Sequence, residues 1–231
     1  MNLSKQKSHN KKDSAMAGTK TNTIVTRIAT YSILIIMTFL IFVPIFWMIS
    51  TSLKTEAVMF DTPIELIPSE PTLESYKNLW TAYPFLTYLR NSIFVVSAAT
   101  FFSVSISTFA GYGISRFKFR GRGFYMSFLL ATQLFPSIML LIPYYKIFKS
   151  LNLIDSLYGL IVAYVSFTIP FCTWMMRGYF NGISRDLDQA ASIDGANRFR
   201  VFRSVILPLA WPGIAATAIY AFIAGWNEYL F

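Results

Sequence analysis

The sequence has few of the side chains that make catalytic or metal-binding sites. Cys172 is the one cysteine and His9 the one histidine among 231 residues. A single cysteine excludes an intrachain disulfide, and a single histidine in the N-terminal tail leaves no metal-ligand cluster. The sequence also has no phosphate-binding glycine loop and no serine–histidine–acid set. We therefore expect no catalytic residue and no metal site, so that an enzyme acting alone is disfavoured.

Charged residues are scarce and segregated. They make up 13% of the chain, against 55% hydrophobic residues, whereas a soluble domain is nearer a quarter charged. A helix needs roughly 20 apolar residues to cross a bilayer, and five uncharged stretches reach that length. We therefore predict an all-α, polytopic membrane helix bundle. Its spans are expected at about residues 29–52, 91–115, 124–145, 157–176 and 210–226.

The basic residues predict the orientation of these spans. With the N-terminus in the cytoplasm, inner segments hold fifteen Lys and Arg residues and outer segments hold five, as the positive-inside rule requires. The net charge of +9 then marks the inner leaflet of a lipid bilayer, and no nucleic-acid-binding pattern accompanies it. Residues 1–23 are polar and predicted to be a disordered cytoplasmic tail, followed by a membrane domain over residues 24–231.

A polar segment rich in small residues, 181–208, separates the last two predicted spans on the cytoplasmic side. Ser184 is suited to N-cap a short helix with Asp186 and Asp188 in or near its first turn, where the helix dipole favours negative charge. One face of that helix is narrow, so that the backbone of another protein has room to approach. Its residues are Leu187, Ala190, Ala191 and Asp194.

The second half of this segment predicts a turn and another short helix. Gly195 is expected to take a positive φ and turn the chain. A helix over about 197–205 carries three arginines before Pro208 breaks it. The result is a rigid helix–turn–helix, the kind of surface that another protein binds. The alternative is an ordinary solvated loop.

Three polar residues in or at the ends of spans are candidates for a transport pathway, because intramembrane polar groups usually serve function. They are Asn91, Gln133 and Glu228. The alternative is structural: Gln133 bonds a neighbouring helix, and the other two lie in interfacial water. The third span also holds Pro136 and Pro143, where a break would expose backbone carbonyls.

The spacing of the polar segment resembles the EAA loop of ABC importer permeases. A small-residue triplet, Gln189-Ala190-Ala191, is followed after three residues by Gly195, and after nine more by Val205, Leu207 and Pro208. Together with Trp226-Asn227-Glu228 at the end of the fifth span, the chain resembles the carbohydrate ABC importer permease family. Within it, the chain is similar to the second permease subunit of the maltose importer.

This resemblance implies a set of partners in a bacterial or archaeal cytoplasmic membrane. They are a second permease subunit, a dimer of ATP-binding subunits and an extracytoplasmic sugar-binding protein. No cofactor is then bound by this chain, because ATP and Mg²⁺ belong to the ATPase. The residues implied in coupling to the ATPase are Gln189, Ala190, Ala191, Asp194, Gly195, Ala196, Leu207 and Pro208.

The sequence departs from this family in two respects. Gln189 stands where the family usually has glutamate, and the family continues past Trp-Asn-Glu into a sixth span. We therefore expect the natural product to continue for one further apolar run of about 20 residues. Three alternatives remain at this stage: an ABC permease for a non-sugar solute, a secondary transporter or channel without an ATPase, and a non-transport scaffold.

Overall fold

The computed structural model describes residues 3–59 and 64–230, and these residues form helices, turns and loops with no β-strand. The chain divides into two compact units, Met1–Phe85 and Leu86–Phe231, each described by itself below. Within the described residues, three continuous helices are long and apolar enough to cross a membrane, or five spans if two bent helix pairs each count as one. The fold is therefore the predicted all-α type.

Unit 1 contains α1 (Leu3–Ser52), α2 (Glu56–Met59) and α3 (Glu74–Thr81). Residues Ile24–Ser52 of α1 are long and apolar enough to span a bilayer, as predicted for 29–52, and Pro44 lies inside the helix. The helix also continues through residues 3–23, where the sequence predicts disorder. Extending an existing helix is much cheaper than nucleating one, and Lys, Gln, Ala and Met in this tail are good helix formers.

Polar contacts connect the C-terminal end of α1 to residues 65–66. Lys54 is only 2% exposed, and its ammonium group donates a hydrogen bond to the carbonyl of Glu65. The same ammonium lies 4.9 Å from the centre of the Trp47 ring, within cation–π range. Ser50 donates to the carbonyl of Leu66 at 2.5 Å. These contacts hold residues 65–66 against the last turns of α1.

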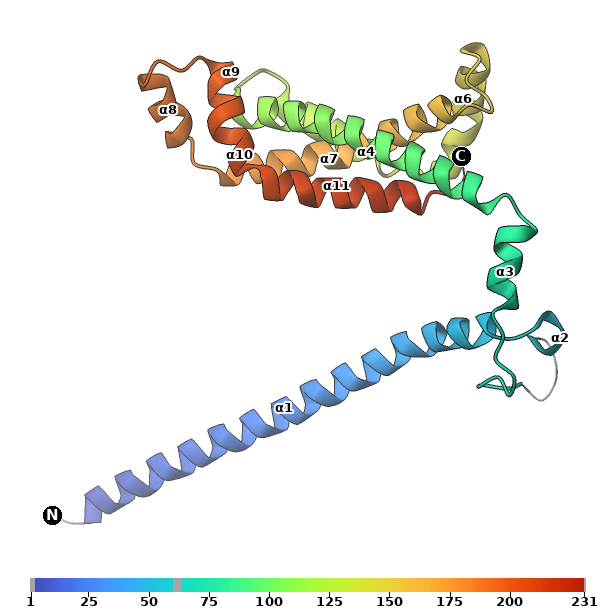
Figure 1. The fold of residues 1–231 in the computed structure, drawn as a ribbon. Coiled ribbons are helices and arrows are strands. Elements are labelled where there is room, and N and C mark those ends of the chain that lie inside the picture. Colours follow the sequence, from blue (N-terminus) through green and yellow to red (C-terminus); the bar gives the residue numbers. More distant parts are fainter. Residues whose placement is uncertain (1–2, 60–63, 231) are drawn as a thin grey trace. The chain divides into compact units, whose positions relative to one another are not determined.

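Unit 2 is built around three helices: α4 (Phe85–Arg116), α7 (Leu157–Gly182) and α11 (Trp211–Trp226). Figure 1 shows them side by side along the unit. α4 and α7 cover the second and fourth predicted spans, and α7 continues through Pro170. The helices approach closely at glycines, as membrane helices commonly do. A Cβ on Gly111 of α4 would lie 2.8 Å from the backbone nitrogen of Arg177, and one on Gly213 of α11 would meet the Tyr179 ring.

The third predicted span, 124–145, is not a continuous helix. It consists of α5 (Arg122–Thr132) and α6 (Ser137–Ser150), which meet at an angle of 97°. At 1.5 Å per residue, α5 is about 16 Å long and too short to cross the roughly 30 Å apolar core alone. The break falls just before Pro136, which forms the N-cap of α6, whereas Pro143 lies inside α6. One of the two prolines breaks the helix, and the other is tolerated within it.

Candidate functional site

The candidate coupling segment lies at one end of unit 2. It consists of α8 (Asp186–Ile193), α9 (Arg198–Val201), a π-helical turn (Phe202–Ile206) and α10 (Leu207–Leu209). Figure 1 shows α8 and α9 at the end of the unit opposite to α6. At the start of α8, the Ser184 hydroxyl accepts from the backbone N–H of Asp186 at 3.2 Å. Ser184 thus supplies a hydrogen bond of the expected kind, although Arg185 occupies the N-cap position.

Gly195 turns the chain between α8 and α9 as predicted. Its φ is +82°. In this region of φ the backbone of an L-residue that has a side chain is strained. The N–H of Ala196 donates to the carbonyl of Ala191 at 3.0 Å, and the N–H of Gly195 donates to that of Ser192 at 3.1 Å. This pair of bonds is the Schellman motif of a helix C-terminus. Asn197 then caps α9 by accepting from the N–H of Arg200 at 2.9 Å.

The predicted coupling residues divide into an inner and an outer group, which differs from the single free face that the sequence predicts. Ala191, Ala196 and Leu207 are partly buried against a core that includes Phe180 and Ile206. The outer group is exposed and consists of Gln189, Ala190, Asp194, Gly195 and Pro208. Small inner residues are needed because α8 packs on the bundle as well as presenting a surface. Ala191 and Ala196 therefore set how close α8 lies to the core.

Two exposed apolar residues, neither among the predicted coupling residues, add to the outer surface. Ile193 on α8 is 86% exposed, beside the exposed Asp194. Phe199 on α9 is also exposed. Exposed apolar surface in a polar segment is a feature of protein–protein interaction sites. The sequence signal that would have identified this surface is the presence of two hydrophobic residues, at positions 193 and 199, in an otherwise polar segment.

Pro208 does not end the helix, contrary to the sequence prediction. The helix continues to Leu209, and the chain bends by 72° between α10 and α11. In the π-helical turn before the proline, the N–H of Leu207 donates to the carbonyl of Phe202. This wider turn changes the hydrogen-bond register, so that a proline without an N–H fits in the following turn. The bend itself falls at Ala210, before Pro212.

A network of polar contacts, absent from the sequence prediction, attaches α8 to the bundle. The Arg116 Nε at the end of α4 lies 3.1 Å from the Asp188 carboxylate. The Arg116 guanidinium also donates to the carbonyls of Phe180 and Ile183, both at 3.1 Å. Arg185 donates to the carbonyl of Ser115 at 2.6 Å, across 70 residues of sequence. Asp188 was interpreted only as a helix-dipole residue, because nothing local indicates a partner so far away.

The three predicted pathway residues line two adjoining pockets. Gln133 and Glu228 line one of about 210 Å³, and Asn91 and Glu228 line a second of about 370 Å³. Both pockets share Tyr164, Gly225 and Glu228. The Gln133 amide also donates to the carbonyl of Phe167 on α7 at 3.2 Å. The pocket contacts fit the functional interpretation, and the bond to α7 fits the structural alternative for Gln133.

The Glu228 carboxylate is held by its own backbone. Oε1 accepts from the N–H groups of Tyr229 and Leu230, at 3.0 and 2.9 Å. These two bonds fix the side chain at the end of α11, where it faces both pockets. Among the described residues, those that line the two pockets include no lysine, arginine or histidine. Any solute in either pocket therefore meets hydroxyls, an amide, aromatic rings and one carboxylate.

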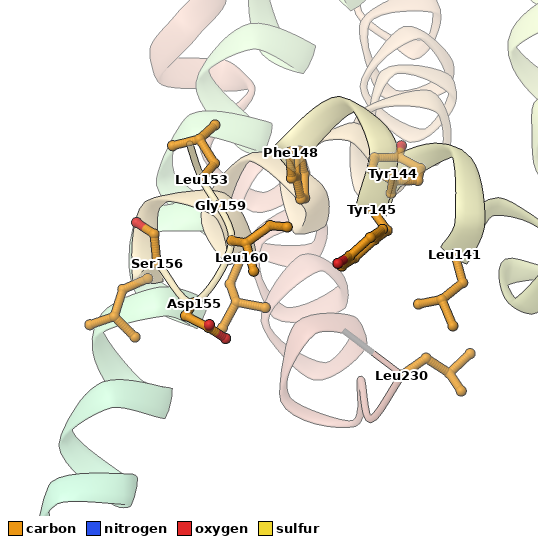
Figure 2. Close-up of a pocket in the computed structure, with 12 residues that line it drawn as sticks. Leu141, Tyr144, Tyr145, Phe148, Leu153, Asp155, Ser156, Gly159, Leu160 and Leu230 are labelled. Atoms are coloured by element: carbon orange, nitrogen blue, oxygen red, sulfur yellow. The ribbon is translucent and has the colours of Figure 1, made fainter. Parts of the chain in front are cut away.

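A larger pocket, of about 510 Å³, lies elsewhere. It is formed by α6, the following loop, the start of α7 and Leu230, and contains none of the predicted site residues. Figure 2 shows Tyr144, Tyr145 and Phe148 on one side and Leu160 on another, with Asp155 at the edge. Most of its lining is apolar. Size alone therefore does not identify the candidate functional site of this chain.

The helix bundle, the bent helix pairs and the candidate coupling segment together define a multi-pass membrane protein of the ABC importer permease type. A model of the protein family described as "Binding-protein-dependent transport system inner membrane component" matches residues 103–231. This match covers more than half of the chain. It includes the candidate coupling segment and the α11 residues that line the pockets of about 210 and 370 Å³. The chain belongs to this family of inner membrane transport components.

Similar proteins with curated names are also transport system permeases. The chain is 37% identical over 187 residues to the sulfoquinovosyl glycerol transport system permease protein SmoH of Agrobacterium fabrum, covering 81% of this chain and 66% of that protein. It is 36% identical over 199 residues to the trehalose/maltose transport system permease protein MalG of Thermococcus litoralis, covering 85% and 71%. The chain thus spans about two thirds of the length of these relatives.

A solved structure shares the fold. It is described as the crystal structure of a bacterial ABC transporter involved in the import of the acidic polysaccharide alginate. The TM-score is 0.76 at 26% identity, with 89% of this chain and 72% of that chain covered. The helix bundle of this chain is therefore an ABC transporter permease fold.

Proposed function

We propose that this chain is a permease subunit of an ATP-driven, binding-protein-dependent importer for a sugar or oligosaccharide. The observation that carries the proposal is the coupling segment: a Schellman turn at Gly195 with Ala190 and Ile193 exposed on its outer surface. Relatives named for transport of sulfoquinovosyl glycerol, trehalose or maltose, and diacetylchitobiose support a sugar as the solute.

The proposed partners follow from the family. A second permease subunit supplies the other half of the pathway, two ATP-binding subunits hold ATP and Mg²⁺, and a sugar-binding protein docks outside. The outer surface of α8, with Gln189, Ala190, Asp194 and Gly195, lies in a cleft of the ATPase. Gln189 in place of glutamate still accepts and donates hydrogen bonds, but brings no charge to that interface.

In the proposed mechanism, closure of the ATPases on ATP displaces the coupling segment and changes which side of the membrane the pathway faces. The pockets at Asn91, Gln133 and Glu228 then form this subunit's share of the pathway. Their hydroxyl, amide and carboxylate groups suit the hydroxyls of a sugar, and aromatic rings such as Phe135 and Phe167 suit its apolar face. The N-terminus and the coupling segment are cytoplasmic in this proposal.

Purification in mild detergent tests the assembly. We expect an ATPase and a second permease to be recovered with this chain, and ATP hydrolysis to rise when the sugar-loaded binding protein is added. Recovery of neither partner contradicts the assignment and favours a transporter or channel acting without ATP. Stimulation by a binding protein loaded with an amino acid or peptide, and not with a sugar, contradicts the proposed solute class.

A further inference from the structure

Arg116, the last residue of α4, connects three elements of unit 2. Its Nη1 donates to the carbonyl of Phe180 in α7, and its Nη2 donates to the carbonyl of Ile183, which follows α7. Its Nε lies 3.1 Å from the carboxylate of Asp188 on α8, in an ion pair that lacks hydrogen-bond geometry. One guanidinium therefore contacts the end of α7, the connecting loop and the first turns of α8.

A second arginine makes the reverse connection. Arg185, directly before α8, donates to the carbonyl of Ser115 in the last turn of α4. The Ser115 hydroxyl in turn donates to the side-chain oxygen of Asn181 in α7, at 2.8 Å. The last carbonyls of a helix have no partner within the helix, and cations near this end are favoured by its dipole. The two arginines thus donate to carbonyls at the C-terminal ends of α4 and α7.

The chain itself gives α8 no direct link to α4. The polypeptide connects α8 to α7 through residues 183–185 and to α11 through the π-helical turn and the 72° bend. α4 leads instead into the turn before α5. The polypeptide passes a movement of α8 to α7 and α11 first. The same movement reaches α4 through the contacts of Arg116, Asp188 and Arg185. Their contacts therefore form a direct polar connection between α8 and α4, next to the hydrogen bond of Tyr112 on α4 with Asp188.

The surroundings of this connection make it stiff. The side chains of Arg116 and Asp188 are 7% and 22% exposed, so water screens their attraction less than on an open surface. A guanidinium is planar and presents its donors in a fixed fork, which holds several acceptors in one geometry. The neighbouring Phe180 is fully buried, and close-packed interiors transmit displacement because they deform little.

We propose that Arg116 is a positioning residue that transmits movement of α8 into α4 and α7 through its ion pair with Asp188. This inference rests on the proposed function, in which an ATPase holds the outer surface of α8. Asp188 has the complementary role, because it faces the bundle and passes the movement of α8 to Arg116. Gln189 and Ala190 belong instead to the surface that docks on the ATPase. ATPase binding and transmission are therefore separable by mutation.

The test uses the complete complex with its ATPase and second permease in lipid nanodiscs. Cys172 is replaced by Ala, Gln133 by Cys, and the rate of labelling at position 133 by a membrane-impermeant maleimide is measured with and without ATP and vanadate. Into this background we introduce Asp188→Asn and Arg116→Gln, singly and together. Arg120→Gln is the matched control, since Arg120 lies on the exposed turn after α4.

We expect both single variants to recover the ATPase at the yield of the background. Their ATP-driven change in labelling rate should fall about tenfold, within the roughly 5- to 150-fold range of coupling between sites. The double variant should be no worse than either single one, as expected when two residues act as one pair. Arg116→Lys should restore part of the response, because an ammonium pairs with Asp188 but lacks the fork that also holds both carbonyls.

Three outcomes overturn the inference. A full ATP-driven response in both single variants means that the pair transmits nothing. Loss of ATPase recovery in both means that the pair only shapes the docking surface. Additive losses in the double variant mean that the two residues act separately. Failure of the proposed function has a different signature, because the background protein then recovers no ATPase or shows no ATP-driven change at position 133.

Discussion

The hydroxyl of Ser103 on α4 lies 2.6 Å from that of Thr168 on α7, and both residues are buried. Thr168 directs its proton to the carbonyl of Tyr164, at 2.8 Å, so Ser103 is the donor between the helices. A second contact follows further along, where the Thr173 hydroxyl donates to that of Ser107 at 3.2 Å. A polar seam thus joins α4 and α7, the two continuous membrane helices of unit 2.

Removing the Ser103 hydroxyl should weaken this seam by a modest amount. We expect Ser103→Ala to lower the free energy of unfolding by about 0.6 kcal/mol, and at most about 1.7 kcal/mol, the range measured for hydrogen bonds between membrane helices. Denaturant titration in mixed micelles measures the change. Ser105→Ala, on the same helix but not fully buried, is the control. An equal loss in both variants would contradict a specific role of the seam.

The close approach of α4 and α7 makes a second prediction. A Cβ on Gly111 would lie 2.8 Å from both the Cβ of Met176 and the backbone nitrogen of Arg177, whereas one on Gly113 meets nothing within 4 Å. Gly111→Ala should therefore cost roughly 1–3 kcal/mol of stability, as overpacking usually does. Gly113→Ala should be neutral or stabilising by up to about 1 kcal/mol, because alanine is the better helix former. The melting temperatures of the two variants in detergent report the difference.

Local chemistry made parts of this structure predictable. The uncharged stretches predicted α4 and α7, because bilayer thickness and helix rise fix the length of a span. Gly195 was predicted to turn the chain because few other residues adopt a positive φ, and its φ of +82° confirms this. Both predictions depend on a few neighbouring residues and on no partner elsewhere in the chain.

Contacts between distant residues explain what the sequence did not predict. Pro136 breaks the third span, while Pro143 and Pro170 lie within helices. The amino-acid composition around these three prolines does not distinguish the one that breaks a helix. Ala191 packs inward because α8 lies on the core around Phe180. The ion pair of Arg116 with Asp188 joins residues that only the folded bundle brings together. Tertiary packing decides each of these features.

The proposed topology predicts which positions react from which side of the membrane. After Cys172→Ala, single cysteines at positions 120 and 195 should be protected from an impermeant maleimide in intact cells. Cysteines at positions 70 and 149 should react. The reason is the bias of fifteen inner against five outer basic residues. Labelling of position 195 in intact cells, at the rate of position 70, would reverse the orientation of the coupling segment.

Glu65 gives a prediction on pH in the segment after α1. Its carboxylate accepts from the Ser69 hydroxyl at 2.8 Å and from the Ser69 backbone N–H at 3.2 Å. These two bonds, with a smaller contribution from the charge of Lys54, hold the pKa of Glu65 below its ordinary value.

A lowered pKa in the folded state fixes the sign of the pH effect. The stabilisation is fully present above the pKa of the unfolded chain and is lost as the pH falls through the folded pKa. The protection of the Ser69 amide, which is its exchange rate relative to the intrinsic rate at the same pH, should therefore fall on acidification. Ser69→Ala should raise the pKa of Glu65 toward its ordinary value, as followed by NMR titration of the carboxyl carbon. An unchanged pKa in this variant would show that the hydroxyl has no such effect.

Substitutions at the turn between α8 and α9 test the docking surface directly. Gly195→Val places a β-branched side chain at a φ of +82°, which costs about 1–2 kcal/mol and should reduce ATPase recovery roughly 5- to 30-fold. Gly195→Asn is the matched control, because asparagine tolerates this conformation and should retain most of the binding.

Ala190→Trp should abolish ATPase recovery, since a close interface at the exposed Ala190 has no room for an indole. Membrane insertion should be unchanged in all three variants, as judged by protein in carbonate-washed membranes. If Gly195→Val and Ala190→Trp both recovered the ATPase at the wild-type yield, α8 and its turn would not be the docking surface.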